Sequence, residues 1–99
     1  MKNKQLAENT YHVNQSWYYD QIIQRENATF RVAIRRNAYD TQSSAKVERW
    51  DGEKWQWVYG EPITKCKCRN ISYVDRTVTS TDFREDADRL FAVAFAIAD

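Results

Sequence analysis

The chain has 99 residues, of which 42% are hydrophobic and 29% charged, and its formal net charge is +1. This composition is typical of a folded globular protein and argues against an intrinsically disordered chain. The near-neutral charge also argues against a protein that binds nucleic acid through a large basic surface.

The N-terminal residues 1–16 are polar, rich in Asn and Gln, and lack a clean hydrophobic period. We therefore expect them to form a flexible arm, followed by a single α+β domain over residues 17–99. The arm contains no apolar signal segment, and the longest apolar run, 90–98, is far shorter than the roughly 20 residues that a helix needs to cross a bilayer. These features predict a cytoplasmic protein without a membrane partner.

Two strands are expected early in the domain. Residues 17–25 are rich in aromatic and β-branched side chains, which favours a strand over a helix. Residues 29–36 alternate apolar and polar side chains, as a half-buried strand does.

Residues 45–59 are predicted to form a β-hairpin, because the tripeptide 50–52 (Trp-Asp-Gly) ends in a glycine that tolerates positive φ. Two registers are compatible with this turn. A two-residue loop leaves Trp55 and Trp57 on the face of the charged residues, whereas a three-residue loop places Trp55 opposite Val47. The second register buries two indoles, so we expect both tryptophans in the core.

The C-terminal segment is predicted to be a helix from Asp82 to Ala98, because an acidic first turn is followed by an alanine-rich run without glycine or proline. Asp82 is the expected N-terminal cap. A short edge strand is expected at 71–74. The fold prediction is therefore a three- to four-stranded antiparallel sheet, built on the hairpin and packed against the C-terminal helix. The apolar stripe of this helix is wider than such a sheet requires, and we expect a homodimer through Phe91 and Phe95.

Sites for catalysis, cofactors or metals are not expected. The chain has one histidine, and its two cysteines, Cys66 and Cys68, are separated by one residue, unlike the paired C-x-x-C motifs of structural zinc sites. Its only glycines are Gly52 and Gly60, so a glycine-rich phosphate loop is excluded. We interpret the cysteines as half-buried thiols and the protein as non-enzymatic.

The candidate binding residues lie in the loop before the hairpin and in its turn. They are Arg, Tyr and Trp, which are over-represented at binding hot spots, with polar neighbours. The set is Arg35, Arg36, Tyr39, Asp40, Gln42 and Trp50. It predicts a non-catalytic protein-binding module. The alternative is a small nucleic-acid-binding protein that uses an aromatic and basic sheet face.

The segment Arg36-Asn37-Ala38-Tyr39-Asp40-x-Gln42-Ser43, followed by Arg49-Trp50-Asp51-Gly52-x-x-Trp55, resembles small uncharacterised proteins of phages and other mobile elements. The resemblance covers about the middle quarter of the chain and brings no known activity with it. It implies a context in which small proteins inhibit host defence proteins, as anti-CRISPR and anti-restriction proteins do. The implied partner is an unidentified host protein.

Overall fold

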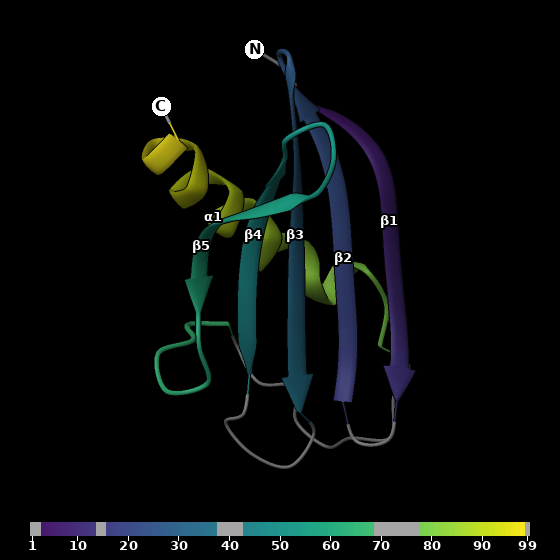
Figure 1. The fold of residues 1–99 in the computed structure, drawn as a ribbon. Helices are drawn as coiled ribbons and strands as arrows, with labels where there is room; N and C mark the ends of the chain where they lie inside the picture. The colour runs from purple at the N-terminus through teal and green to yellow at the C-terminus, as the bar shows by residue number, and fades with distance from the viewer. Residues whose placement is uncertain (1–2, 14–15, 38–42, 69–77, 99) are drawn as a thin grey trace.

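The computed structural model describes residues 3–13, 16–37, 43–68 and 78–98. These residues form an α+β fold in which five antiparallel strands, arranged in chain order, make one sheet that packs against one C-terminal helix (Figure 1). The elements are β1 Lys4–Val13, β2 Ser16–Arg25, β3 Ala28–Asn37, β4 Ser44–Trp50, β5 Trp55–Glu61 and α1 Thr81–Ala98. The predicted fold class is confirmed, with five strands in place of the three or four expected.

The additional strand is β1, at the edge of the sheet. It pairs with β2 along its whole length, from Lys4 opposite Gln24 to Val13 opposite Ser16. The prediction of a flexible arm over 1–16 is therefore wrong for residues 4–13. The edge strand expected at 71–74 lies outside the described residues.

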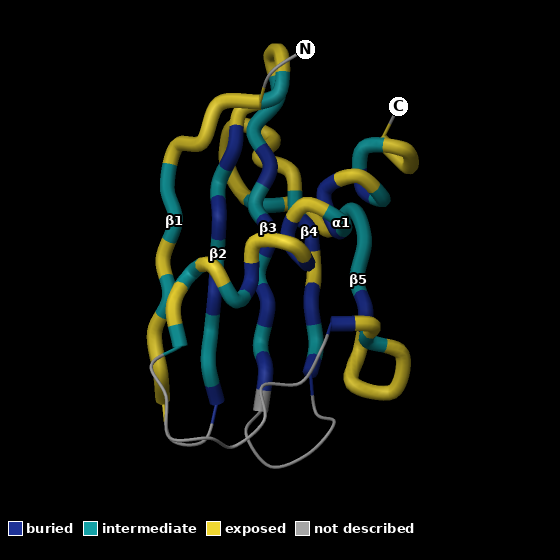
Figure 2. The backbone as a smooth tube through the Cα atoms, turned by 180° about the vertical axis from the view of Figure 1, so that it is seen from behind, coloured by how far each residue is buried: buried dark blue, intermediate teal, exposed yellow. Residues whose placement is uncertain are grey.

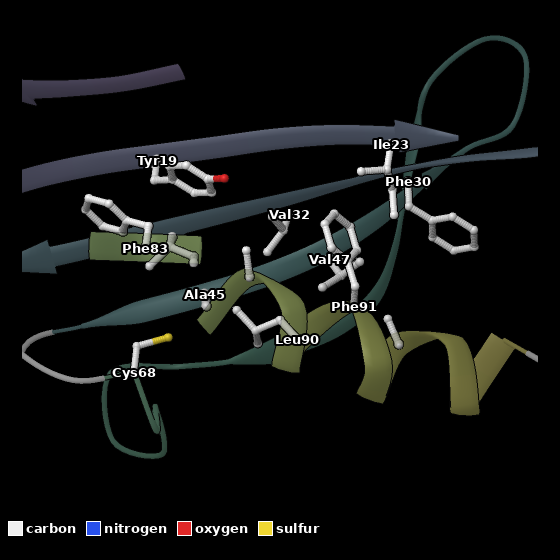
Figure 3. Close-up of a cluster of buried hydrophobic side chains, with 13 residues drawn as sticks. Tyr19, Ile23, Phe30, Val32, Ala45, Val47, Cys68, Phe83, Leu90 and Phe91 are labelled. Atoms are coloured by element: carbon white, nitrogen blue, oxygen red, sulfur yellow. The ribbon is translucent and has the colours of Figure 1, made fainter. Parts of the chain in front are cut away.

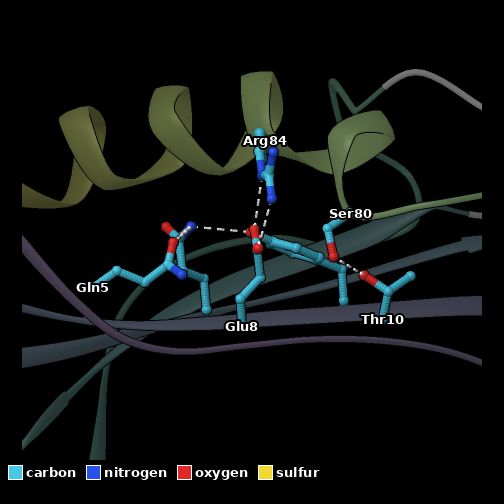
Figure 4. Close-up of polar contacts among 7 residues, drawn as sticks. Gln5, Glu8, Thr10, Ser80 and Arg84 are labelled. Atoms are coloured by element: carbon cyan, nitrogen blue, oxygen red, sulfur yellow. Dashed lines mark hydrogen bonds and ion pairs between the residues drawn. The ribbon is translucent and has the colours of Figure 1, made fainter.

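Polar contacts hold β1 to its neighbours (Figure 4). Arg84 of α1 donates two hydrogen bonds to the Glu8 carboxylate, at 2.9 and 3.0 Å, and Tyr19 Oη donates a third at 2.6 Å. The Gln21 side-chain amide donates to both Gln5 Oε1 and Tyr19 Oη, each at 3.0 Å. The bond from Arg84 is the main reason that the pKa of Glu8 falls to about 2, against an opposing effect of burial.

The helix prediction is confirmed, with a start one residue earlier than expected. The backbone N–H of Thr79 donates to Asp82 Oδ2 at 2.9 Å. Asp82 therefore acts from inside the first turn and reaches back to the preceding residues, as the acidic member of a capping box does. Thr10 Oγ1 and Ser80 Oγ lie 2.6 Å apart, which fixes the start of α1 beside β1.

The hydrophobic core lies between the sheet and α1 (Figure 3). Buried and partly buried positions alternate along β3, as the predicted half-buried strand requires (Figure 2). Tyr19 stacks on Phe83 with the ring centroids 5.1 Å apart and nearly parallel. The buried residues of this core include Phe30, Val32, Ile34, Val47, Leu90 and Ala94.

The apolar stripe of α1 packs within the chain. Phe91 is buried, and Phe95 packs edge-on against Phe30 with the ring centroids 5.0 Å apart. The Arg25 guanidinium lies 4.4 Å from the centre of the Phe95 ring. The assignment of Phe91 to a dimer interface is therefore wrong. The width of the stripe does not require a second copy, because Phe91 is buried within the chain and Phe95 packs on Phe30 and Arg25.

The register of the hairpin also differs from the prediction. Trp50 pairs with Trp55, so the loop has four residues. A β-bulge then shifts the register, so that Tyr59 faces Val47 while Trp57 lies on the opposite side of the sheet. The prediction that Trp55 and Trp57 belong to the core is wrong: Trp57 is 66% exposed.

Candidate functional site

The face of the sheet opposite α1, called here the open face, is not covered by any described helix. In Figure 1 the helix lies behind the sheet and the open face is turned toward the viewer, with the tip of the β4–β5 hairpin curling over it. Alternate side chains from all five strands point to this face.

A groove of about 520 Å³ runs across the open face, and all five strands contribute to its lining. This volume lies within the range of small-ligand and side-chain binding pockets. The floor is formed by small residues and the walls by aromatic rings. The lining residues that matter here are Tyr11, Tyr18, Ala33, Lys46, Trp57 and Gly60.

Two tyrosines form one wall of the groove. Tyr11 of β1 and Tyr18 of β2 are directly opposite each other in the strand register. Their rings stack with centroids 5.2 Å apart and an angle of 10° between the planes. Tyr11 is 52% exposed. The stacked rings are therefore oriented by each other and can still be reached by a ligand in the groove.

Trp57 lines the groove from β5, and its position depends on Gly60. A Cβ atom added at Gly60 would lie 2.8 Å from Trp57 Nε1, closer than such contacts allow. The indole therefore packs against the backbone of Gly60, and a side chain at this position would displace it. The pairing of Trp57 with Glu48 turns the indole to the open face, and the absence of a side chain at Gly60 lets the indole pack closely on the strand.

The charges on the groove are mixed. Arg35 and Lys46 bring positive charge and Asp20 negative charge. Asn9 Nδ2 donates a hydrogen bond of 3.0 Å to Asp20 Oδ1, and Lys46 Nζ lies 3.6 Å from a carboxylate oxygen of Glu48. Glu61 also lines the groove, so its positive and negative charges are close to balanced.

The tip of the hairpin lies beyond the groove and has its own contacts. The Arg31 guanidinium stacks on Trp55 at 4.3 Å from the ring centre and donates to Glu48 Oε1 at 2.7 Å. Trp50 contacts Trp55 edge-on, with centroids 5.3 Å apart, and is 41% exposed. Trp50 is thus accessible, as predicted, but it does not line the groove.

The structure separates the two neighbouring arginines that were predicted to bind a partner. Arg35 points to the open face and lines the groove. Arg36 points to the other face, where it is 3% exposed, forms an ion pair with Asp86 of α1 and lies over the Phe83 ring. The surface role predicted for Arg36 is wrong, because adjacent strand residues face opposite sides and this one is covered by the helix.

The other predicted binding residues, Tyr39, Asp40 and Gln42, lie outside the described residues. The groove residues that the prediction missed are Tyr11, Tyr18, Lys46 and Trp57. The signal for Trp57 was present in the rejected hairpin register, which places it on the same face as Lys46. Tyr11 gave no such signal, since β1 itself was not predicted.

A second cluster lies at the end of β5 and combines two thiols with a carboxylate. The ligand atoms of Glu61, Cys66 and Cys68 all lie within 4.8 Å of one another. Arg89 of α1 donates to both carboxylate oxygens of Glu61, at 2.7 and 3.0 Å, and lies 3.6 Å from Cys68 Sγ. Burial raises the pKa of Glu61, but hydrogen bonds from Arg89, from the Lys67 N–H and from Tyr59 outweigh it and lower the pKa to about 2.

Comparisons with known proteins give no match: no family model, no curated protein and no solved structure is similar to this chain. The resemblance of the central motif to phage proteins stays a prediction. Among the described residues, no helix has the length and apolar character needed to cross a membrane. Function is therefore proposed from the geometry alone.

Proposed function

We propose that this protein is a non-catalytic binding module that docks a segment of another protein in the groove on the open face of the sheet. The observation that carries the proposal is Trp57, which is two-thirds exposed and packs closely on the backbone of Gly60. An exposed indole costs the protein solubility, while a tryptophan already fixed in position loses little entropy on binding. Tryptophan is also among the residues that most often dominate binding energies.

The stacked tyrosines opposite Trp57 support the same role. Tyr11 and Tyr18 are rigid amphipathic rings, which add contact area at a low entropic cost. Ala33 lies between the walls, and its small side chain leaves space for an inserted side chain. The groove thus suits an aliphatic or aromatic side chain from a partner.

The charges favour a protein segment over a nucleic acid. Asp20 lines the groove and Glu48 lies beside Lys46, so a phosphate backbone following the groove would meet negative charges. Arg35 and Lys46 suit a carboxylate next to the inserted apolar side chain. The preferred ligand is therefore an apolar residue with an acidic neighbour.

A selection from a random peptide library displayed on phage tests this proposal. Peptides that pair an aromatic or aliphatic residue with Asp or Glu should be enriched, and their affinity is then measured with purified variants. Trp57→Ala should weaken binding about 30-fold, the equivalent of about 2 kcal/mol for a hot-spot tryptophan. Trp50→Ala is the matched control and should leave the affinity unchanged, because Trp50 is also exposed but lies outside the groove.

A single-stranded oligothymidine is the second probe, measured over a series of salt concentrations. Nucleic-acid binding would show as an affinity that falls steeply with salt. Tighter binding of the oligonucleotide than of any selected peptide would overturn the proposal in favour of the nucleic-acid alternative. Equal losses of peptide affinity in Trp57→Ala and Trp50→Ala would also overturn the proposal, because the groove would then not be the peptide-binding site.

A further inference from the structure

The loop that follows β5 brings three potential metal ligands together. Glu61 and Cys68 are buried, and Cys66 is partly exposed. The backbone N–H of Lys67 donates to Glu61 Oε1 at 2.9 Å, so the loop folds back onto the carboxylate and carries both sulfurs to it. The three ligand atoms lie within 4.8 Å of one another before any ion is bound.

The ligand types and their surroundings suit zinc. Zn²⁺ accepts thiolate sulfur and carboxylate oxygen in tetrahedral sites and often has three protein ligands and one exchangeable position. Tyr59 Oη donates to Glu61 Oε2 at 2.8 Å, which gives the carboxylate the outer support that metal ligands usually have. The partly exposed Cys66 provides the side from which an ion can enter.

Arg89 contacts the ligand atoms that a metal ion would bind. Its guanidinium bonds both oxygens of Glu61 and lies 3.6 Å from Cys68 Sγ, so one positive group already contacts an oxygen and a sulfur of the cluster. A cysteine binds a metal ion as a thiolate, so an ion that enters the cluster has to displace the proton of the Cys68 thiol. The Arg89 side chain is 32% exposed and can turn to solvent.

We propose that Glu61, Cys66 and Cys68 form a Zn²⁺ site that is closed by Arg89 when no metal is bound. Metal binding replaces the guanidinium and releases the thiol protons, and the bound ion then carries two thiolates and one carboxylate. The exposed Lys65 and Lys67 flank the site and offset its remaining negative charge. Arg89 of α1 contacts Glu61 at the end of β5. Zinc binding would therefore break this contact between helix and strand and join Glu61 to Cys66 and Cys68 of the following loop. This inference does not rest on the proposed function of the groove, which shares only Glu61 with the cluster.

Zinc binding to the full chain is measured under reducing conditions, after treatment with a chelator, by competition with a chromophoric chelator. The wild type should bind one Zn²⁺ per chain, and Cys66→Ser should abolish binding. Arg89→Met should bind Zn²⁺ about tenfold more tightly, since a charge-assisted hydrogen bond no longer has to be broken. Arg84→Met is the matched control, because Arg84 makes a similar two-bond contact to Glu8 away from the thiols and should leave zinc affinity unchanged.

Co²⁺ provides a direct readout of the ligands, because a thiolate-to-cobalt charge-transfer band appears only when sulfur is bound. The proposal expects this band in the wild type and its loss in Cys66→Ser, a change at a partly exposed position. Absence of zinc binding in the wild type would overturn the proposal. Zinc binding that is unchanged in Cys66→Ser, or equal increases in affinity in Arg89→Met and Arg84→Met, would also overturn it.

Discussion

Single residues determine where the aromatic side chains of this protein lie. Gly60 is the clearest case, because a methyl group at this position would displace the indole of Trp57. Asp51 has a comparable role in the hairpin loop, where Oδ1 accepts hydrogen bonds from two backbone N–H groups, at 2.8 and 2.9 Å, and Oδ2 accepts one from Gln56. Gly52 follows with φ of 102°, a conformation that favours glycine. The loop therefore closes over four residues, and Trp57 reaches the open face.

Gly60→Ala is expected to weaken binding of a selected peptide while the fold is retained. The added methyl group lies on the open face, where it meets the indole of Trp57 and not the core. We expect a loss of affinity of about tenfold, which corresponds to about 1.4 kcal/mol. Titration calorimetry measures the affinity, and circular dichroism checks the fold. An unchanged affinity would show that the position of the indole is not important for binding.

The elements are joined by ion pairs as well as by the core. Along α1, Arg84 binds Glu8 of β1, Asp86 binds Arg36 of β3, and Arg89 binds Glu61 of β5. The helix is thus tied to both edges of the sheet and to its centre.

The polar character of β1 is the reason that the sequence did not predict it. Its residues that face the helix side, such as Glu8 and Thr10, make hydrogen bonds where a typical edge strand packs apolar side chains. Hydrophobic periodicity detects strands by their apolar side chains and gives no signal for such a strand. The same applies to the site: the groove is assembled from five strands, and only the pairing in space brings Tyr11 next to Tyr18 and opposite Trp57. The alternating side chains of β3 and the capped, alanine-rich sequence of α1 are local signals, so these two elements were predicted well.

Acid should weaken the attachment of β1 and β5 to α1. The folded-state pKa values of Glu8 and Glu61 are both lowered from 4.5 to about 2. For a carboxyl group with a lowered pKa, the stabilisation is present above the unfolded-state pKa and is lost as the pH falls through the folded-state value. The free energy of unfolding should therefore decrease between about pH 5 and pH 2, as measured by urea denaturation.

Glu61→Gln is the variant that tests this pH dependence. In this variant the free energy of unfolding should fall less steeply with decreasing pH, because one of the two carboxyl groups with a lowered pKa has been removed. The variant should also be less stable than the wild type at pH 7. A variant with the wild-type pH profile would mean that the pair of Glu61 with Arg89 does not contribute to stability. Glu53→Gln is a suitable control, since Glu53 is exposed in the hairpin loop.

At the scale of the whole molecule, the two faces of the sheet have different roles. One face packs against α1 and contains nearly all of the buried apolar side chains. The other carries Tyr11, Tyr18 and Trp57 around a groove and has no described helix over it. A small chain that needs only one core uses one face of its sheet for stability, and the second face is then available for recognition.

The four tryptophans report on these two faces separately. Trp57 lies in the groove, Trp50 and Trp55 at the hairpin tip, and Trp17 packs against the core on the helix side. Each indole N–H gives a separate signal in a two-dimensional ¹⁵N NMR spectrum, and single Trp→Phe variants assign them.

Titration of the ¹⁵N-labelled protein with a selected peptide, followed through these indole signals, measures directly whether the peptide binds to the open face. If the peptide binds to the open face, the Trp57 signal should shift in proportion to the bound fraction, while the Trp17 signal should stay in place. A shift of Trp17 without a shift of Trp57, or binding that moves neither signal, would contradict the assignment of the binding site to the open face.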